Sequence, residues 1–415
     1  MEAFYVFLND LVNKNKQDYS GEFQVQWLNS YLASEQEEKR SALVQQFSGQ
    51  ILFKETKPYC NQISEGCQLC GKGLWSCLFI TNKCNANCFY CPTEQKNDEV
   101  PNTQNLSFST PEAYAEYINY FGFKGVSFSG GEPLLYFDRV VDYLKALRKS
   151  CSPDIYIWMY TNGILADTYK LRRLAECGLD EIRFNIGATN YSIEAIQRAK
   201  GLINNITVEI PAVPEERDRL ILLLPKLIDA GVSNLNLHQL RLTKYNYHRL
   251  LQKDYTYIPA ERPLVMESEL TALEVLTHVK NNCLPIGVNY CSFHFKNRFQ
   301  KAGYRKMIAA KLGNPDDQLT ENGFIRKKAA DRIHYEKLVL ADEDSDIKPN
   351  RGFALSFKKY KLTRYLASEK LNVPAGLQFE VDQLVEREPF QIPTDELLFK
   401  IWQKEYIERG IRSYF

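Results

Sequence analysis

The sequence has no long apolar run, no excess of one charge and no basic segment at its start. No stretch approaches 18 consecutive apolar residues, so we expect no membrane-spanning helix. Lysine and arginine number 52 against 51 aspartates and glutamates, and the net charge of +1 excludes a polyelectrolyte that binds along its whole length. The opening residues MEAFYVFLND carry early acids, so we expect no signal peptide there.

Cysteine, by contrast, is abundant and unevenly spread. Seven of the eleven cysteines lie between Cys60 and Cys91, and the other four are Cys151, Cys177, Cys283 and Cys291. An odd count in a 415-residue chain with no expected signal peptide argues against a disulfide framework. We therefore predict a cytoplasmic protein that binds metal through its clustered cysteines. Cys151, Cys177 and Cys283 fall on or near predicted helix ends, where we expect structural roles.

Short apolar runs alternate with helical patterns through the middle of the chain. The strand-like runs lie at 77–81, 125–129, 155–160, 181–186, 206–210 and 234–240. This alternation predicts an α/β fold with a parallel sheet and helical crossovers. A later helical pattern, ESELTALEVLTHVKNN, and the strand-like IGVNYCSF are candidates to extend the sheet.

The two ends of the chain differ from this middle part. Residues 1–50 are polar, with helical patterns in AFYVFLNDLVNK, FQVQWLNSYLA and KRSALVQQF, and residues 51–76 form a cysteine-rich segment. Residues 313–415 mix strand-like and helical patterns, which predicts a small α+β region. The stretch 294–364 holds 17 lysines and arginines against nine acids, with interleaved aromatics. Such a surface could bind nucleic acid or an acidic peptide, but we favour an ordinary solvated surface.

Three cysteines stand together in CNANCFYC, directly after the first strand-like run of the series. Cys84, Cys88 and Cys91 have the spacing C-x3-C-x2-C, in a loop at the carboxyl end of a strand, where barrel active sites form. Thiolates favour iron–sulfur clusters or zinc. Three thiolates can hold three irons of a cubane and leave the fourth open for a ligand, although the spacing alone also leaves a zinc site open.

This segment resembles the signature of the radical S-adenosylmethionine (SAM) superfamily, C-x3-C-x-Φ-C with an aromatic Φ, here Tyr90. The resemblance implies a partial (β/α)6 barrel over residues 77–312 and a [4Fe-4S] cluster on the three cysteines, with SAM on the open iron. It also implies reductive cleavage of SAM to a 5′-deoxyadenosyl radical, which removes hydrogen from a substrate that the sequence does not name. A low-potential electron donor of the flavodoxin or ferredoxin type is the implied partner.

A second match is FSGGEPLL at the end of the next strand-like run. Two glycines let the backbone approach a ligand closely, and a glutamate can accept hydrogen bonds from an ammonium group. The resemblance places Gly130, Gly131 and Glu132 against the amino group of SAM. Taken alone, the same residues are an ordinary turn between a strand and a helix.

Two further strand ends carry weaker matches. MYTNGIL resembles the third strand of the family, which implies that Thr161 and Asn162 line the SAM pocket, although Asn-Gly is also a common turn. IRFNIGA implies that Asn185 meets the ribose of SAM, or else caps a turn. TVEIPAVP resembles the segment beside the adenine, with Ile210 and Val213 as candidates.

Another cysteine group, in CNQISEGCQLCGKGLWSC, precedes the first strand of the barrel. We predict a second metal site for zinc, iron or an auxiliary iron–sulfur cluster, with Cys60, Cys67 and Cys70 as ligands. Cys291 is our preferred fourth ligand and Cys77 the alternative; unligated thiols are the competing interpretation. The two cysteine groups should lie toward opposite ends of this strand, unless the upstream segment folds back over the rim.

The combined pattern resembles a radical SAM group related to pyruvate formate-lyase activating enzymes, although the upstream cysteines and the long basic carboxyl-terminal part depart from minimal activases. We therefore keep activation of a glycyl-radical enzyme as an alternative to another hydrogen abstraction. From a different class, a non-catalytic iron–sulfur, zinc or electron-transfer protein is the other alternative. His238, at a predicted strand end, could contact SAM or substrate, but a structural histidine is the interpretation that we favour.

Overall fold

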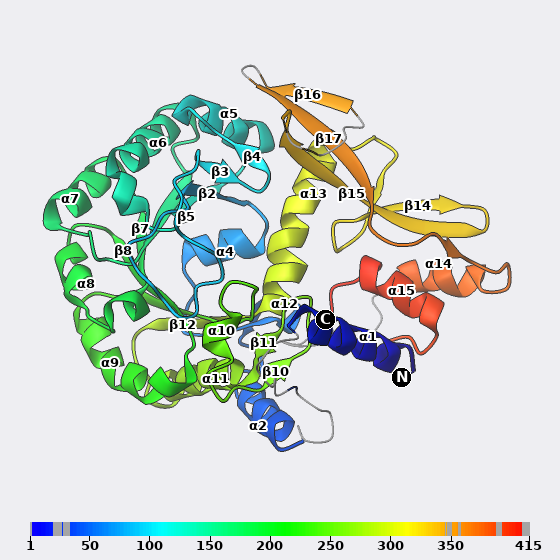
Figure 1. Cartoon of the computed structure of the whole chain (residues 1–415), viewed down its shortest axis with the longest axis horizontal. Coiled ribbons are helices and arrows are strands. Elements are labelled where there is room, and N and C mark those ends of the chain that lie inside the picture. Colours follow the sequence, from blue (N-terminus) through cyan, green and yellow to red (C-terminus); the bar gives the residue numbers. More distant parts are fainter. Residues whose placement is uncertain are drawn as a thin grey trace.

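The computed structural model describes residues 2–19, 27, 34–344, 346, 351–355, 358–386 and 392–408. Apart from Trp27, the helix expected at FQVQWLNSYLA lies outside the described residues. Figure 1 shows a curved sheet with helices on its outer side and a smaller sheet beside it.

The larger unit is a ten-stranded sheet in the order β1-β12-β9-β8-β7-β6-β5-β2-β3-β4. Within the described ranges, seven neighbouring strands run parallel. They are β2 (Trp75–Thr81), β5 (Gly125–Gly130), β6 (Tyr156–Thr161), β7 (Glu181–Phe184), β8 (Asn205–Pro211), β9 (Asn234–His238) and β12 (Gly287–Cys291). The predicted parallel sheet is confirmed, and β12 is the extension expected from IGVNYCSF.

Antiparallel strands finish both edges of this sheet. They are β1 (Lys57–Cys60) next to β12, and β3 (Asn102–Thr103) and β4 (Leu106–Ser107) beyond β2. The crossover helices on the outer side are α5 (Pro111–Phe121), α6 (Phe137–Ser150), α7 (Thr168–Glu176), α8 (Glu194–Ala199), α9 (Arg217–Asp229) and α11 (Met266–Asn281). In α5, Pro111 occupies the first turn, as predicted, and the Thr110 hydroxyl accepts a hydrogen bond from the Ala113 amide.

The cysteine-rich segment folds inside the curved sheet. Its helix α4 (Glu65–Gly71) joins β1 to β2 and contacts β2, β5 and β6. A Cβ on Gly66 would lie only 2.3 Å from Nη2 of Arg183, which stands on β7. Glycine is therefore required for α4 to approach the inner face of the sheet.

A second, antiparallel sheet of six strands follows helix α13 (Lys301–Leu312). Its strands are β13 (Gln318–Leu319), β14 (Ile325–Ala329), β15 (Arg332–Asp342), β16 (Arg351–Leu355), β17 (Lys358–Leu366) and β18 (Leu371–Asn372), and helices α14 (Gln378–Glu386) and α15 (Glu396–Glu405) come after it. This is the predicted α+β region. The amino-terminal helix α1 (Glu2–Asp18) packs on α15, where Ala3 meets Phe399 and Trp402 in an apolar cluster.

Helix α2 (Ser34–Gln45) contacts α11. The other connections contain short elements. They are α3 (Leu52–Glu55), α10 (Tyr247–Leu250), β10 (Tyr257–Ile258), β11 (Leu264–Val265), α12 (Phe293–Phe295), the π-helical turn η4 (Lys296–Gln300), and the 3-10 turns η1 (Pro133–Tyr136), η2 (Ile186–Thr189) and η3 (Pro214–Glu216).

Much of the basic stretch is internally paired. Asp317 binds Lys327 and Arg364, each at 2.5 Å, and Lys358 binds Asp342 at 2.5 Å. These ion pairs help to hold the strands of the second sheet together. In the part of the chain that the structure describes, no helix is long and apolar enough to cross a membrane.

Candidate functional site

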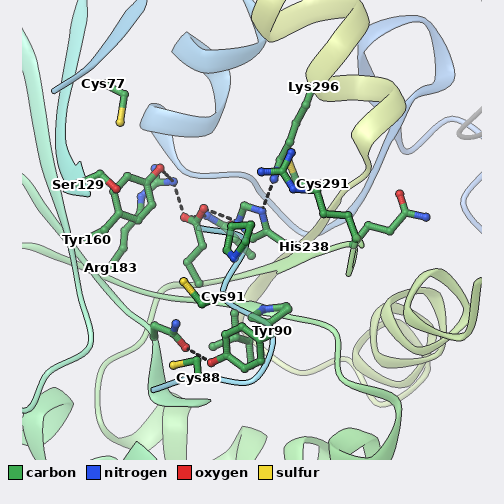
Figure 2. A pocket seen from close by; sticks show the side chains of 18 of the residues that line it. Cys77, Cys88, Tyr90, Cys91, Ser129, Tyr160, Arg183, His238, Cys291 and Lys296 are labelled. Carbon is green, nitrogen blue, oxygen red and sulfur yellow. Dashed lines mark hydrogen bonds and ion pairs between the residues drawn. The ribbon is translucent and has the colours of Figure 1, made fainter. Parts of the chain in front are cut away.

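A cavity of about 430 Å³ lies on the inner side of the curved sheet (Figure 2). It is of a size common for small-molecule sites. Seven of the eleven cysteines line it, namely Cys67, Cys70, Cys77, Cys84, Cys88, Cys91 and Cys291. Residues at the carboxyl ends of the strands line it too, among them Gly130, Thr161, Pro211 and His238. Ligands of parallel α/β folds bind at such strand ends.

The cysteine loop after β2 is held by the segment that follows β9. The Asn246 amide donates to the carbonyl of Tyr90 at 3.1 Å, and the Thr243 hydroxyl donates to the carbonyl of Pro92 at 3.0 Å. The Arg249 guanidinium donates to the carbonyl of Cys88 at 3.1 Å. These contacts fix the loop backbone, and the sequence analysis missed all three donors because none belongs to a recognisable motif.

The two glycines of SGGEP bring the end of β5 against the start of the cysteine loop. Gly130 has φ +117°, and a Cβ there would lie 2.1 Å from the carbonyl oxygen of Thr81. A Cβ on Gly131 would lie 2.1 Å from the carbonyl oxygen of Lys83. The Gly131 amide also donates to Thr81 at 2.7 Å. Both glycines line the cavity, and neither position has room for a side chain.

Glu132 lies behind the cavity lining. Its carboxylate is fully buried and accepts hydrogen bonds from the Thr161 hydroxyl at 2.8 Å and from the Asn162 backbone amide at 2.7 Å. A third bond comes from the Leu134 amide at 3.0 Å. Burial raises the pKa of this carboxyl group. That Glu132 meets the amino group of SAM stays a prediction; in the structure its carboxylate positions Thr161 and Asn162, which line the cavity.

Asn162 and Asn185, the other side chains predicted to bind SAM, contact the cysteine loop. The Tyr90 hydroxyl donates to Asn185 Oδ1 at 2.9 Å. The side-chain amide of Asn162 donates to Asn85 at 2.7 Å and lies 3.7 Å from the sulfur of Cys84. Burial, and after it the nearby Cys88, raises the pKa of Tyr90. The structure thus brings all three side chains to one wall of the cavity.

Of the two residues suggested for the adenine, Ile210 lines the cavity. Val213 does not belong to the lining and packs in a separate apolar cluster that includes Phe89 and Tyr90.

A buried polar network, which the sequence analysis did not identify, occupies the floor of the cavity. The Arg183 guanidinium donates to Glu209 at 2.7 Å and to Glu181 at 3.0 Å. Glu209 also bonds Nε2 of His238, and Lys296 Nζ lies 2.7 Å from Nδ1 of the same ring. Figure 2 shows this chain from Arg183 to Lys296.

The hydrogen bonds and ion pairs of this network set the protonation states of Glu209 and His238. Burial opposes ionisation of Glu209, but Arg183 and His238 overcome it and lower the pKa of the carboxyl group. Burial and the neighbouring Lys296 lower the pKa of His238 to about 4, so the ring is neutral at pH 7. Both of its nitrogens are engaged, as in the structural interpretation that we favoured, although the ring also lines the cavity.

The upstream cysteines divide between two places. Cys67 and Cys70 on α4 line the cavity together with Cys291 at the end of β12. Cys60 does not join them. In the antiparallel pairing of β1 with β12, Cys60 lies opposite Val288, whose side chain packs in the main apolar core. The charged and ionisable groups that act on the Cys60 thiol are Lys280 and Cys283. Because side chains alternate along a strand, Asn289 and Cys291 face the cavity while the positions paired with Val288 face away.

Cys77 also lines the cavity, but it bonds to the hydroxyls of Ser127 and Ser129 on β5. Burial raises the pKa of its thiol to about 12. The two cysteine groups therefore share one cavity, through the folding back of the upstream segment that the sequence left open.

The cysteine loop supplies three thiols to the cavity, one fewer than the four ligands of a closed zinc site. Among the described residues, no three histidine, cysteine, aspartate or glutamate side chains converge as they would around one metal ion. A cubane spreads its thiolates over several irons. Cys84, Cys88 and Cys91 supply three thiols beside an open cavity, which suits a [4Fe-4S] cluster with one free iron.

The chain is similar to several known proteins. The sequence model of the radical SAM superfamily matches residues 78–228. A Methanocaldococcus jannaschii protein named "Putative glycyl-radical enzyme activating enzyme" is 30% identical over 300 residues, which cover 69% of this chain and 76% of that one. The GTP 3′,8-cyclase of Clostridium perfringens is 30% identical over 154 residues, which cover 33% of this chain and 45% of that enzyme.

Among solved structures, SuiB of Streptococcus suis bound to S-adenosylmethionine has a TM-score of 0.39 and 13% identity, covering 76% of this chain and 65% of that one.

Proposed function

The chain belongs to the radical SAM superfamily, whose enzymes use a [4Fe-4S] cluster and SAM, and from this membership we propose that it abstracts hydrogen from an unactivated carbon. When bound, the two cofactors supply reductive cleavage of SAM to methionine and a 5′-deoxyadenosyl radical, which takes the hydrogen atom. Everything else is the task of the protein: to bind and orient SAM, to place the substrate and to keep water out.

Cys84, Cys88 and Cys91 are the residues that would hold the cluster. One observation carries this assignment. The side-chain amide of Asn162, from the end of β6, reaches both the sulfur of Cys84 and the neighbouring Asn85. The cysteine loop and the strand ends that match the SAM-binding motifs therefore form one continuous wall, as a ligand that bridges cluster and strands requires.

SAM would lie along this wall. Gly130 and Gly131 offer backbone close to the ligand, and Asn162 and Asn185 offer side-chain amides. Asn162 is held by Glu132 and Asn185 by Tyr90, so these two side chains need little reorganisation on binding.

The substrate would occupy the part of the cavity between this wall and α4. That part is lined by Arg183, Glu209, His238 and Lys296, which hold one another in fixed positions and offer charged and polar groups to a ligand. A low-potential donor of the flavodoxin or ferredoxin type would supply the electron, and the abundance of reduced thiols suits the cytoplasm.

The test is formation of 5′-deoxyadenosine. Anaerobically reconstituted protein, incubated with SAM and dithionite, should release it together with methionine, and Cys88→Ala should abolish the release. Cys177→Ala is the matched control, because Cys177 caps helix α7 outside the cavity lining. Absence of 5′-deoxyadenosine from a cluster-loaded wild-type protein would contradict the proposal and favour a non-catalytic iron–sulfur protein.

A second candidate is activation of a glycyl-radical enzyme. It is favoured by the name of the Methanocaldococcus jannaschii relative, with which this chain shares 30% identity over 300 residues. Incubation with SAM, reductant and a glycyl-radical enzyme from the same genome should then give a glycyl radical detectable by electron paramagnetic resonance (EPR). Release of 5′-deoxyadenosine without that radical would favour another substrate.

A further inference from the structure

The α4 side of the cavity carries a second group of three thiols. Cys67 and Cys70 are three residues apart on one helix, a spacing that places both on the same face. Cys291 joins them from the end of β12, and all three line the cavity. None of the residues proposed to bind SAM belongs to this group.

The sulfurs of this group receive hydrogen bonds from amide donors. Nδ2 of Asn236 lies 3.2 Å from the sulfur of Cys67, and Nε2 of Gln300 lies 3.2 Å from the sulfur of Cys70. A protonated thiol is a weak acceptor. Amide donors directed at cysteine sulfur are common around thiolate-ligated iron–sulfur clusters, whose potentials they tune.

A buried cation stands beside the same thiols. Lys57 is only 1% exposed and lines the cavity, and its ammonium lies 4.5 Å from the ring centre of Phe295. No carboxylate or hydrogen-bond acceptor within the described residues pairs with it. Lysine is almost never fully buried without a counter-charge. The acidic groups whose charge acts on its ammonium are Cys291, Cys67, Cys70 and Glu209. Glu209 is already paired with Arg183 at 2.7 Å, so negative charge on the three sulfurs would balance Lys57.

We propose that Cys67, Cys70 and Cys291 hold a second iron–sulfur cluster, with one iron left open toward the cavity. Three thiolates and inorganic sulfide supply the negative charge that Lys57 lacks. The group supplies three thiols, one fewer than the four ligands of a closed zinc site.

One iron would lack a protein ligand because the other nearby cysteines and histidine, Cys60, Cys77 and His238, face elsewhere or are already hydrogen-bonded. Cys60, expected from sequence to be a ligand, faces the apolar core. Cys77 bonds to Ser127 and Ser129, and both ring nitrogens of His238 are engaged. The fourth iron would therefore face the region that we assign to the substrate, where a ligand atom of the substrate could bind it.

The site is tested by metal analysis of the anaerobically reconstituted full chain. Wild-type protein should contain about eight irons and about eight sulfides, for two cubane clusters. Cys67→Ala with Cys70→Ala should lower both to about four while a SAM-responsive EPR signal remains. The triple variant at Cys84, Cys88 and Cys91 should also keep about four irons, with a signal that SAM does not change.

Control variants separate ligands from other buried cysteines. Cys291→Ser should lose the same iron as the double variant, whereas Cys60→Ala and Cys77→Ala should keep the wild-type content. Wild-type iron in the double variant, stoichiometric zinc in place of iron, or a triple variant with no cluster would each overturn the proposal. If the double variant does not fold, the triple variant and Cys291→Ser still decide. None of these readouts requires SAM cleavage, so they stand apart from a failure of the proposed function.

Lys57 provides an independent check. Lys57→Gln removes a positive charge beside the cluster, and this should lower the reduction potential of the SAM-insensitive signal and leave that of the SAM-responsive signal unchanged. Equal potentials in variant and wild type would show that no cluster stands beside Lys57 and would overturn the assignment.

Discussion

Tyr90 donates a hydrogen bond to Asn185 Oδ1 at 2.9 Å and so joins the cysteine loop to the carboxyl end of β7. The turn after Asn185 is shaped for this bond, since a Cβ on Gly187 would lie 2.6 Å from the Tyr90 hydroxyl oxygen. A residue that the sequence marks only as the aromatic of a cysteine motif thus positions a side chain 95 residues away.

Tyr90→Phe keeps the ring and removes this bond. A hydrogen bond of this kind contributes roughly 0.5–1.5 kcal/mol, so we expect the Kd for SAM to rise about two- to tenfold with unchanged iron content. Equilibrium binding of SAM to the reconstituted variant is the measurement. Tyr169→Phe, at a 72% exposed position, is the control and should bind SAM normally.

The pair can be examined by a double-mutant cycle with Asn185→Ala. If the two side chains act through one bond, the double variant should lose little more affinity than either single variant. Fully additive losses would show that Tyr90 and Asn185 act separately.

Gly131→Ala should disturb the cysteine loop. The added methyl would lie 2.1 Å from the carbonyl oxygen of Lys83, which belongs to the backbone leading into Cys84 and cannot move without the loop. We expect a reconstituted variant that folds but binds less iron at the SAM-responsive cluster, measured by EPR. Gly376→Ala, where a Cβ meets no atom within 4 Å, is the control. Normal cluster loading in Gly131→Ala would mean that the loop tolerates the displacement.

The fold was largely predictable because its signals are local. Alternating strand-like and helical runs gave the parallel sheet, and the glycines and Pro111 marked the turns where helices begin. The cysteine loop and its strand-end partners followed from motif spacing. The place of the second cysteine group did not, because it depends on α4 folding inside the sheet through the close contact of Gly66 with Arg183, a contact 117 residues apart in the chain.

The buried polar network was missed for a different reason. EIRFNI and NLNLHQL alternate polar and apolar residues with a period of two, and the polar positions, such as Arg183 and Asn236, face the cavity. Parallel strands are usually apolar on both faces, so this alternation indicates that one face of the sheet borders a polar interior. The alternation of helices and strands along the chain does not carry that information.

Arg183 should be essential for the stability of this interior. It is 2% exposed and pairs with two buried carboxylates, Glu181 and Glu209. Arg183→Met leaves both without a cation, and breaking a buried pair typically costs about 3–5 kcal/mol. We expect a loss of this size in the free energy of unfolding, measured by urea denaturation. Arg219→Met, whose ion pair is 44% exposed on the arginine side, should cost at most about 1 kcal/mol. Equal losses in the two variants would contradict the pairing.

Asp317 gives the second sheet a defined dependence on pH. Its carboxylate is 5% exposed and binds Lys327 of β14 and Arg364 of β17, each at 2.5 Å. Burial opposes ionisation, but the bonds to Arg364 and Lys327 overcome it and lower the pKa of Asp317 from 3.8 to about 2. A carboxyl group whose pKa is depressed in the folded state contributes stability above its unfolded value and loses it as pH falls.

Asp317→Asn should therefore lower the free energy of unfolding by about 1–2 kcal/mol at pH 7. The difference from wild type should shrink as the pH falls below about 4 and vanish only below pH 2, where the wild-type carboxyl group is itself mostly protonated. Urea denaturation of both proteins without bound clusters at several pH values measures it. Asp316→Asn, at an exposed neighbouring position, should stay within about 0.5 kcal/mol of wild type throughout. A difference for Asp317→Asn that does not change between pH 7 and pH 2 would show that its charge does not stabilise the sheet.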